Sequence, residues 1–156
     1  MIHFLLCFNR QSKVRLSKFY STYTPTEKNR ATREVMNQVL SRSPKFCNFV
    51  QWREFTIVYQ RFASLFFVMV TDSTDNELVT LESIQRFVVV LDIVFGNICE
   101  LDLIYEFQRA YQVLDEFLLT GHLQESSSKE ILRAINDAEG MEKSLLVAEV
   151  LDQHFL

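Results

Sequence analysis

The sequence predicts a domain of the α+β class, in which one antiparallel-rich sheet is covered by helices. Residues 2–8 and 14–20 are apolar and β-prone, and the polar insert between them suits a hairpin loop. A helical pattern, three strand-like stretches and then only helical patterns follow along the chain. This order of elements is typical of an α+β domain.

The first helix is predicted to begin after Thr24 and to run to about Ser41. Thr24 and Glu27 have the spacing of a capping box, and Pro25 occupies the first helical position. The stretches "FCNFVQW", "TIVYQ" and "FASLFFVMV" then predict three strands. Because the last of them is apolar on both faces, it is expected at the centre of the sheet.

Two longer helices follow a polar loop over residues 71–76. Apolar residues recur at spacings of three and four over residues 78–95, and Gly96 stands where glycine commonly ends a helix. The same periodicity predicts one third helix from Leu103 up to a stop at Gly121. The second half of the chain is therefore expected to be helical.

Composition limits the classes of protein that this chain can belong to. Its 156 residues are 48% hydrophobic and 13% aromatic, which predicts a folded domain with one core. The net charge of −4 gives no basic excess, so a dedicated nucleic-acid binder is not expected. No stretch approaches the ~20 apolar residues of a membrane span. Cys7, Cys47 and Cys99 lie among apolar residues and are interpreted as reduced, buried thiols of a cytosolic protein.

Patterns that carry catalysis or bind a cofactor are not found. The chain has no glycine-rich phosphate loop, no nucleophile elbow and no histidine pair at zinc spacing. Asp72, Asp75 and Glu77 are interpreted as capping and dipole residues, because the glycine of a calcium loop is missing. Glu100 and Asp102 are acids without a nucleophile placed beside them. We expect no enzyme activity, no metal and no cofactor.

Several longer strings resemble the small (sigma) chain of the clathrin adaptor complexes. They are "MIHFLLCFNRQSKVRLSKFY", "FVQWREFTIVYQRFASLFF", and the segment from "DNELVTLESIQRFV" through "VFGNICELDLIYEF" to "LDEFLLTGHLQESS". The resemblance is ungapped over about residues 1–135. Trp52, Pro44 and the extended C-terminus are more similar to the trans-Golgi and endosomal type than to the plasma-membrane type. Ser12 departs from the glycine of relatives and is expected to need a less favourable backbone or another turn type.

The resemblance implies a longin-like (SNARE-like) fold, with a five-stranded antiparallel-rich sheet flanked by helices and extra C-terminal helices. It implies a small subunit held against a large subunit, within a heterotetramer of two large chains, one medium chain and one small chain. Such a complex is cytoplasmic and peripheral on trans-Golgi, endosomal and clathrin-coated vesicle membranes, so membrane contact is indirect. With its large partner, the small chain of this family binds acidic dileucine sorting signals in cargo tails.

The resemblance also implies which residues bind the signal. The positions that match the family's pocket are Ala63, Leu65, Val88, Asn97, Ile98 and Leu103, and the cation for the acidic residue matches Arg15. Apolar side chains would hold the two leucines, and Asn97 would hydrogen-bond the peptide backbone. From the residues alone, Leu65, Val88 and Leu103 would be assigned to the core. Cys99, Glu100 and Asp102 are expected to hold this segment in place.

Two alternatives stay open at this point. One is the small chain of the plasma-membrane endocytic adaptor, or of another longin-type coat such as coatomer. The other is a small enzyme that uses Glu100 or Asp102 as an acid or base. The expected organisation is a sigma-chain domain over residues 1–138, including a helix that a capping box at Ser127 begins, and a helical or mobile tail over residues 139–156.

Overall fold

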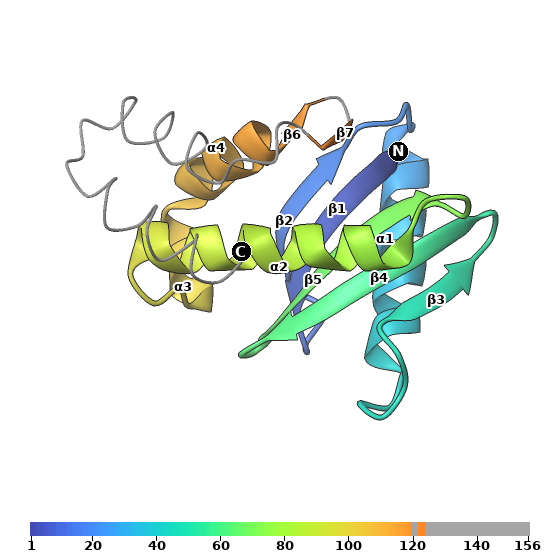
Figure 1. Cartoon of the computed structure of the whole chain (residues 1–156), viewed down its shortest axis with the longest axis horizontal. Coiled ribbons are helices and arrows are strands. Elements are labelled where there is room, and N and C mark those ends of the chain that lie inside the picture. The colour runs from blue at the N-terminus through green and yellow to red at the C-terminus, as the bar shows by residue number, and fades with distance from the viewer. Residues whose placement is uncertain (120–121, 124–156) are drawn as a thin grey trace. The chain divides into compact units, whose positions relative to one another are not determined.

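The computed structural model describes residues 1–119 and 122–123, which fall into two compact units, residues 1–84 and residues 85–156. The predicted stop at Gly121, the helix from Ser127 and the tail 139–156 lie outside the described residues. The elements drawn in Figure 1 are β1 Ile2–Asn9, β2 Val14–Phe19, α1 Pro25–Leu40, β3 Phe49–Trp52, β4 Phe55–Phe62, β5 Leu65–Asp72, α2 Glu77–Phe95, α3 Glu100–Tyr105, α4 Phe107–Phe117, β6 Leu118–Leu119 and β7 His122–Leu123.

The first unit is built on a five-stranded antiparallel sheet in the order β2-β1-β5-β4-β3. β5 is the central strand, paired with β1 on one side and β4 on the other, and its first seven residues are all buried. A strand buried on both faces needs apolar residues at successive positions, as this one has. The predicted central position of β5 is confirmed, and so is the α+β class with a five-stranded antiparallel sheet.

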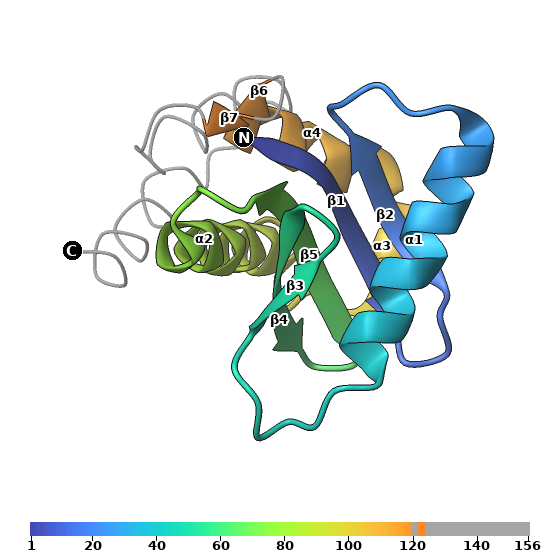
Figure 2. The same cartoon turned by 90° about the vertical axis from the view of Figure 1, so that its right-hand side faces the viewer.

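Helix α1 covers one face of this sheet (Figure 2). The Thr24 hydroxyl accepts a hydrogen bond from the Glu27 N–H at 3.3 Å, and the Glu27 carboxylate accepts one from the Thr24 N–H at 2.8 Å. This is the predicted capping box, and Ser41 is the C-terminal cap. The core beneath the helix comes from its inner face and from alternate strand residues: Ala31, Val35, Met36, Val39, Phe4, Leu6, Phe8, Trp52, Ile57, Tyr59, Phe66, Val68 and Val70.

The turns of the sheet differ from the prediction at two places. Phe62 ends β4 and pairs with Leu65, so it does not begin the next strand. Ala63 adopts a φ of 53° in the two-residue turn that follows, a left-handed conformation typical of hairpin turns and not of regular strands. At the other end of β5 the strand continues to Asp72, because Thr71 and Asp72 still pair with β4. Ser12, in the β1–β2 hairpin, has a φ of 62°, the unfavourable backbone that was expected there.

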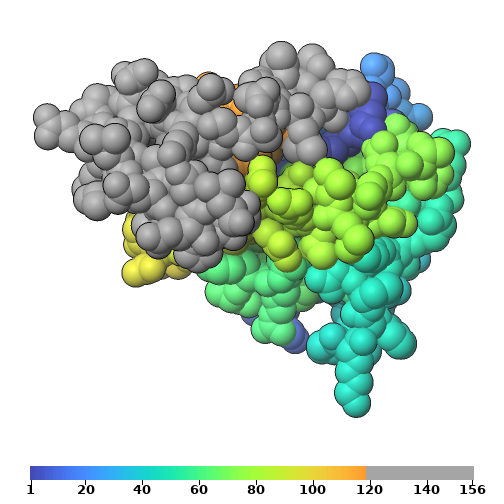
Figure 3. Space-filling view, viewed as in Figure 1, coloured from blue at the N-terminus to red at the C-terminus, as the bar shows by residue number. Residues whose placement is uncertain are grey.

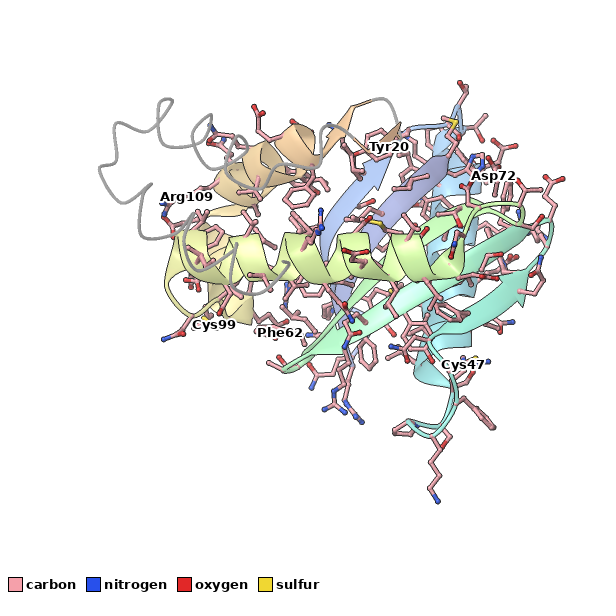
Figure 4. The ribbon with its side chains drawn as sticks, viewed as in Figure 1. Tyr20, Cys47, Phe62, Asp72, Cys99 and Arg109 are labelled. Carbon is pink, nitrogen blue, oxygen red and sulfur yellow. The ribbon has the colours of Figure 1, made fainter. Side chains whose placement is uncertain are left out.

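Asp72 and Asp75 hold the start of the chain and do not cap α2, contrary to the prediction, whereas Glu77 lies in the first turn of α2, where an acid was predicted. The Asp72 carboxylate lies 2.5 Å from Nε2 of His3, and both Asp72 and Asp75 bind the amino group of Met1 (Asp72 is labelled in Figure 4). The bond with His3 lowers the pKa of the Asp72 carboxyl. Asn76 caps α2, because its side-chain oxygen accepts the Leu78 N–H at 3.0 Å.

The second unit contains the greater part of α2, together with α3 and α4. The prediction of a single helix from Leu103 is wrong, because the helix breaks at Glu106, whose φ and ψ are −119° and 38°. α4 then ends at Phe117, before the predicted stop. The Phe87 and Phe117 rings of this unit lie edge to face, with centroids 5.8 Å apart. Phe107, directly after the break, is 46% exposed, although this residue continues the apolar periodicity of the sequence.

The three cysteines differ in exposure. Cys7 is buried in β1, as predicted, whereas Cys47 and Cys99 are exposed, so the expectation of burial is wrong for these two. Cys47 lies on the connection between α1 and β3, and Cys99 comes directly before α3. Both stand outside the regular elements, where an apolar sequence neighbourhood does not determine burial.

Candidate functional site

The segment after α2 turns sharply through two residues with left-handed backbones. Gly96 has a φ of 64° and Asn97 a φ of 68°. The Asn97 N–H donates to the Asp92 carbonyl at 3.0 Å, and the Gly96 N–H donates to the Ile93 carbonyl at 3.3 Å. These two bonds are the Schellman motif, which satisfies the last carbonyls of a helix. The predicted helix stop at Gly96 is confirmed, and its geometry is a tight reversal of the chain.

Asp92 holds this turn with its side chain as well as with its backbone. Its Oδ1 accepts the N–H of Ile98 at 3.0 Å, six residues further along the chain. One residue later, the Cys99 N–H donates to Oδ2 of Asp102 at 3.0 Å. Two carboxylates therefore fix successive N–H groups between α2 and α3. The structure confirms the expected framing role for Asp102 and adds Asp92, which the sequence analysis missed.

The predicted site residues of the second unit divide into buried apolar side chains and one exposed amide. Val88, Ile98 and Leu103 are 4%, 6% and 1% exposed. Asn97, between the helix stop and Ile98, is exposed. The reversal thus places a polar side chain at the surface directly before an apolar one that is buried.

The remaining predicted site residues belong to the first unit. Leu65 begins β5 and is 1% exposed, and Ala63 is exposed in the β4–β5 turn. Arg15 is half-buried on β2. The structure brings Ala63 and Leu65 together at one turn, and Asn97, Ile98 and Leu103 together around another. These two groups lie in different compact units.

The described residues provide little that suggests catalysis. Within residues 1–119 and 122–123, no group of three or more His, Cys, Asp or Glu side chains is arranged to hold a metal ion. Asp92 and Asp102, which lie on either side of the turn in sequence, accept backbone N–H groups and so act as structural acceptors. No helix in the described part of the chain is both long enough and apolar enough to cross a membrane.

The family model of the clathrin adaptor complex small chain matches residues 1–142. The chain belongs to this family. The small chain is similar to AP-1 complex subunit sigma-2 of Dictyostelium discoideum, with 53% identity over 88% of this chain and 89% of the relative. It is 52% identical to AP-1 complex subunit sigma-1 of Arabidopsis thaliana, over 87% and 84% of the two chains. It is 44% identical to human AP-1 complex subunit sigma-3, over 98% and 99%.

Solved structures support the same assignment. The small chain is similar to a chain in the homology model of the full-length AP-3 complex in a stretched open conformation. The TM-score is 0.68 at 27% identity, and the match covers 99% of each chain. This similarity agrees with the longin-like fold that the resemblance implied. As a member of this family, the small chain is a subunit of an adaptor coat in vesicle transport, and the family is not known for enzymes.

Proposed function

We propose that this small chain is the sigma subunit of an AP-1-type adaptor complex, peripheral on trans-Golgi, endosomal and clathrin-coated vesicle membranes. The support is that relatives from an amoeba, a plant and human, 44% to 53% identical, are AP-1 sigma subunits. The matching AP-3 chain is only 27% identical. In the complex, the small chain lies against one large subunit, and a second large chain and a medium chain complete the heterotetramer.

The more specific proposal is that the small chain helps to bind acidic dileucine signals of membrane cargo. The observation that carries it is the reversal at Gly96 and Asn97, which combines an exposed amide with the buried apolar side chain of Ile98. An extended peptide needs polar partners for its backbone beside apolar pockets for its side chains. Asn97 supplies a polar partner for the peptide backbone, and Ile98 and Leu103 supply part of the apolar pocket.

The apolar side chains that we assign to the dileucine pocket are buried in the structure of the small chain. In the second unit Val88, Ile98 and Leu103 are between 1% and 6% exposed, and in the first unit Leu65 is 1% exposed, so each offers almost no surface to a ligand. Two leucine side chains can therefore enter only when neighbouring groups move. We infer that the pocket opens in the assembled complex, and that the isolated chain binds the signal weakly.

We assign Arg15 as the cation that binds the acidic residue of the signal, and we expect a second cation from the large subunit. Arg15 is half-buried on β2. Charge-assisted hydrogen bonds are stronger than neutral ones, and Arg15→Ala should weaken binding by about 1 to 2 kcal/mol. Assembly of the complex should be unchanged, because this proposal gives Arg15 a role in cargo binding only.

Three substitutions test the proposal in the assembled complex, with a fluorescent acidic dileucine peptide as ligand. Val88→Asp places a charge among buried apolar groups and should abolish measurable binding. Asn97→Gly removes the amide but keeps a residue that favours the left-handed backbone, so it should weaken binding roughly threefold to tenfold without unfolding the turn. Leu78→Asp is the control, because it puts the same charge on an exposed part of α2.

The outcomes separate cargo binding from assembly. If the Asn97→Gly complex assembles and binds the peptide as tightly as the unmodified complex, the assigned site is wrong. If Leu78→Asp loses as much affinity as Val88→Asp, the loss reflects added charge and not the pocket.

The type of complex is tested by affinity purification of the tagged chain. An AP-1 large subunit should co-purify with it, whereas an AP-3 or plasma-membrane large subunit would overturn the assignment to AP-1. We also propose that residues 1–138 form the sigma-chain domain and that residues 139–156 are a C-terminal extension. Deletion of residues 139–156 should therefore leave co-purification of the large subunit unchanged.

A further inference from the structure

The first unit contains a cavity of about 330 Å³ at the end of α1, next to the connection between α1 and β3. That connection projects downward from the rest of the first unit in Figure 3. Three arginines line the cavity: Arg10 from the β1–β2 hairpin, Arg42 from the connection and Arg61 from β4. Its lining includes no aspartate or glutamate. The cavity is therefore strongly basic in a chain whose net charge is −4.

This cavity lies on the α1 face of the sheet. Phe66 lines it and belongs to the core beneath α1. Because side chains alternate along a strand, Leu65 points to the opposite face. None of the residues assigned above to dileucine binding lines the cavity, although Arg61 contacts the backbone of Ala63. Nothing in the proposed function requires three arginines here.

Two of the arginines are held in place by the fold. Arg42 donates its Nε–H to the Tyr59 hydroxyl at 3.1 Å and an Nη2–H to the Cys47 carbonyl at 3.0 Å. Arg61 donates its Nε–H to the Ala63 carbonyl at 3.1 Å. The terminal amino groups of Arg61 make no hydrogen bond within the described part of the chain. Figure 4 shows nitrogen-tipped side chains gathered between the labelled Phe62 and Cys47.

The hairpin that carries Arg10 is also held. The buried Asn9 side chain accepts the N–H of Gln11 at 2.9 Å and the N–H of Lys13 at 3.0 Å. Arg10 itself is exposed, and it makes no hydrogen bond or ion pair among residues 1–119. Two basic side chains that line one cavity, one from a fixed turn and one from near a strand end, can receive an anion from solvent.

The apolar part of the cavity indicates what carries the anion. Val39, Leu40 and Phe66 form apolar lining, and the Phe46 ring at its side is 60% exposed. The Arg42 guanidinium lies over this ring, 5.3 Å from its centroid, which steadies the ring. An anion attached to a polypeptide brings neighbouring side chains that can cover such a surface, whereas a free ion or a sugar-like headgroup does not.

We propose that this cavity binds a phosphoserine or phosphothreonine of a partner polypeptide, with an adjacent apolar side chain packed on Phe46. A phosphate monoester carries a charge of about −1.5 to −2 near neutral pH, which suits three guanidinium groups better than the single charge of a carboxylate. Arginine recognises phosphate oxygens through paired N–H donors, and the terminal amino groups of Arg10 and Arg61 supply them.

The test uses the complex that co-purifies with the tagged full-length chain. It is titrated with a degenerate library of short fluorescent peptides that carry a central phosphoserine flanked by apolar residues. Matched libraries carry serine or glutamate at that position. The double variant Arg10→Gln, Arg61→Gln should weaken phosphopeptide binding about tenfold or more, because two charge-assisted contacts are lost. The control is Arg33→Gln, an exposed arginine of α1 that does not line the cavity.

A second variant tests the apolar half of the site. Phe46→Ala should weaken the phosphopeptides severalfold but leave competition by inorganic phosphate unchanged, because the free ion makes no apolar contact. Phosphopeptide binding that survives the double arginine substitution overturns the proposal. So does equal binding of the serine library. If vesicles of phosphatidylcholine with a minor fraction of phosphatidylinositol phosphate bind through the arginines and the peptides do not, the site belongs to a lipid headgroup and the proposal is wrong.

Discussion

Two aspartates near opposite ends of α2 fix the chain in different ways. Asp72, the last residue of β5, binds groups about seventy residues away in sequence, the Met1 amine and the His3 ring. Asp92, in the last turn, accepts the N–H of Ile98, six residues away. We expect the Asp72 contacts to depend on the charge of its carboxylate. The Asp92 contact is expected to depend on the position of Oδ1 relative to the neutral Ile98 N–H. We infer that one residue type fixes the start of the chain through its charge and a turn through the position of one oxygen.

The largest effect is expected at Asp92. Asp92→Ala removes the acceptor of the Ile98 N–H, which is partly buried, and should lower the free energy of unfolding by about 1 to 3 kcal/mol. Asp92→Asn keeps a side-chain oxygen in the same place and should cost less than about 1 kcal/mol. Urea unfolding monitored by circular dichroism measures both. Equal losses in the two variants would mean that the charge of Asp92, and not its oxygen, stabilises the turn.

A somewhat smaller effect is expected at Gly96. A Cβ added there would meet no atom within 4 Å, but its φ of 64° is unfavourable for a side chain. Gly96→Ala should therefore cost about 1 to 2 kcal/mol through the backbone alone. Gly96→Asn should cost less, because asparagine tolerates this conformation. If alanine and asparagine cost the same in urea unfolding, the left-handed backbone is not the cause.

The smallest effect is expected at Asp72, which is partly exposed. Asp72→Asn should reduce stability by less than about 1 kcal/mol at neutral pH. The bond with His3 lowers the pKa of Asp72 below 3.8, so its contribution is complete above pH 3.8 and is lost as the pH falls through the lower folded value. Thermal unfolding at several pH values should show the variant and the unmodified chain converging at the acid end. A difference that persists there would exclude ionisation of Asp72 as its source.

Local patterns predicted the elements whose causes are local. The Thr24 capping box, the all-apolar central strand and the stop at Gly96 each follow from a few neighbouring residues. The break at Glu106 could not be predicted in this way, because the apolar periodicity continues through Phe107. The role of Asp72 depends on a partner at the far end of the sequence, which no window of residues contains.

The candidate site was less accessible to sequence reasoning than the fold. Leu65, Val88 and Leu103 are buried, so their positions in the apolar sequence pattern are the same as those of ordinary core residues. Only the resemblance to adaptor small chains identified them as a set. Asp92 lies on a helix and carries a charge, so it is indistinguishable in sequence from a solvent-facing acid. The arginine-lined cavity was missed because its three cations come from three separate elements.

The unequal exposure of the three thiols gives the chain its own chemical reporters. Cys47 stands beside the arginine-lined cavity and Cys99 directly follows the Asn97–Ile98 turn, and both are exposed, whereas Cys7 is buried in β1. An alkylating reagent should therefore modify Cys47 and Cys99 in the native chain and reach Cys7 only when the sheet opens. Protection of Cys47 alone would record a ligand at the cavity, and protection of Cys99 alone a ligand at the turn. One mass spectrum could then distinguish the two proposed sites without any engineered label.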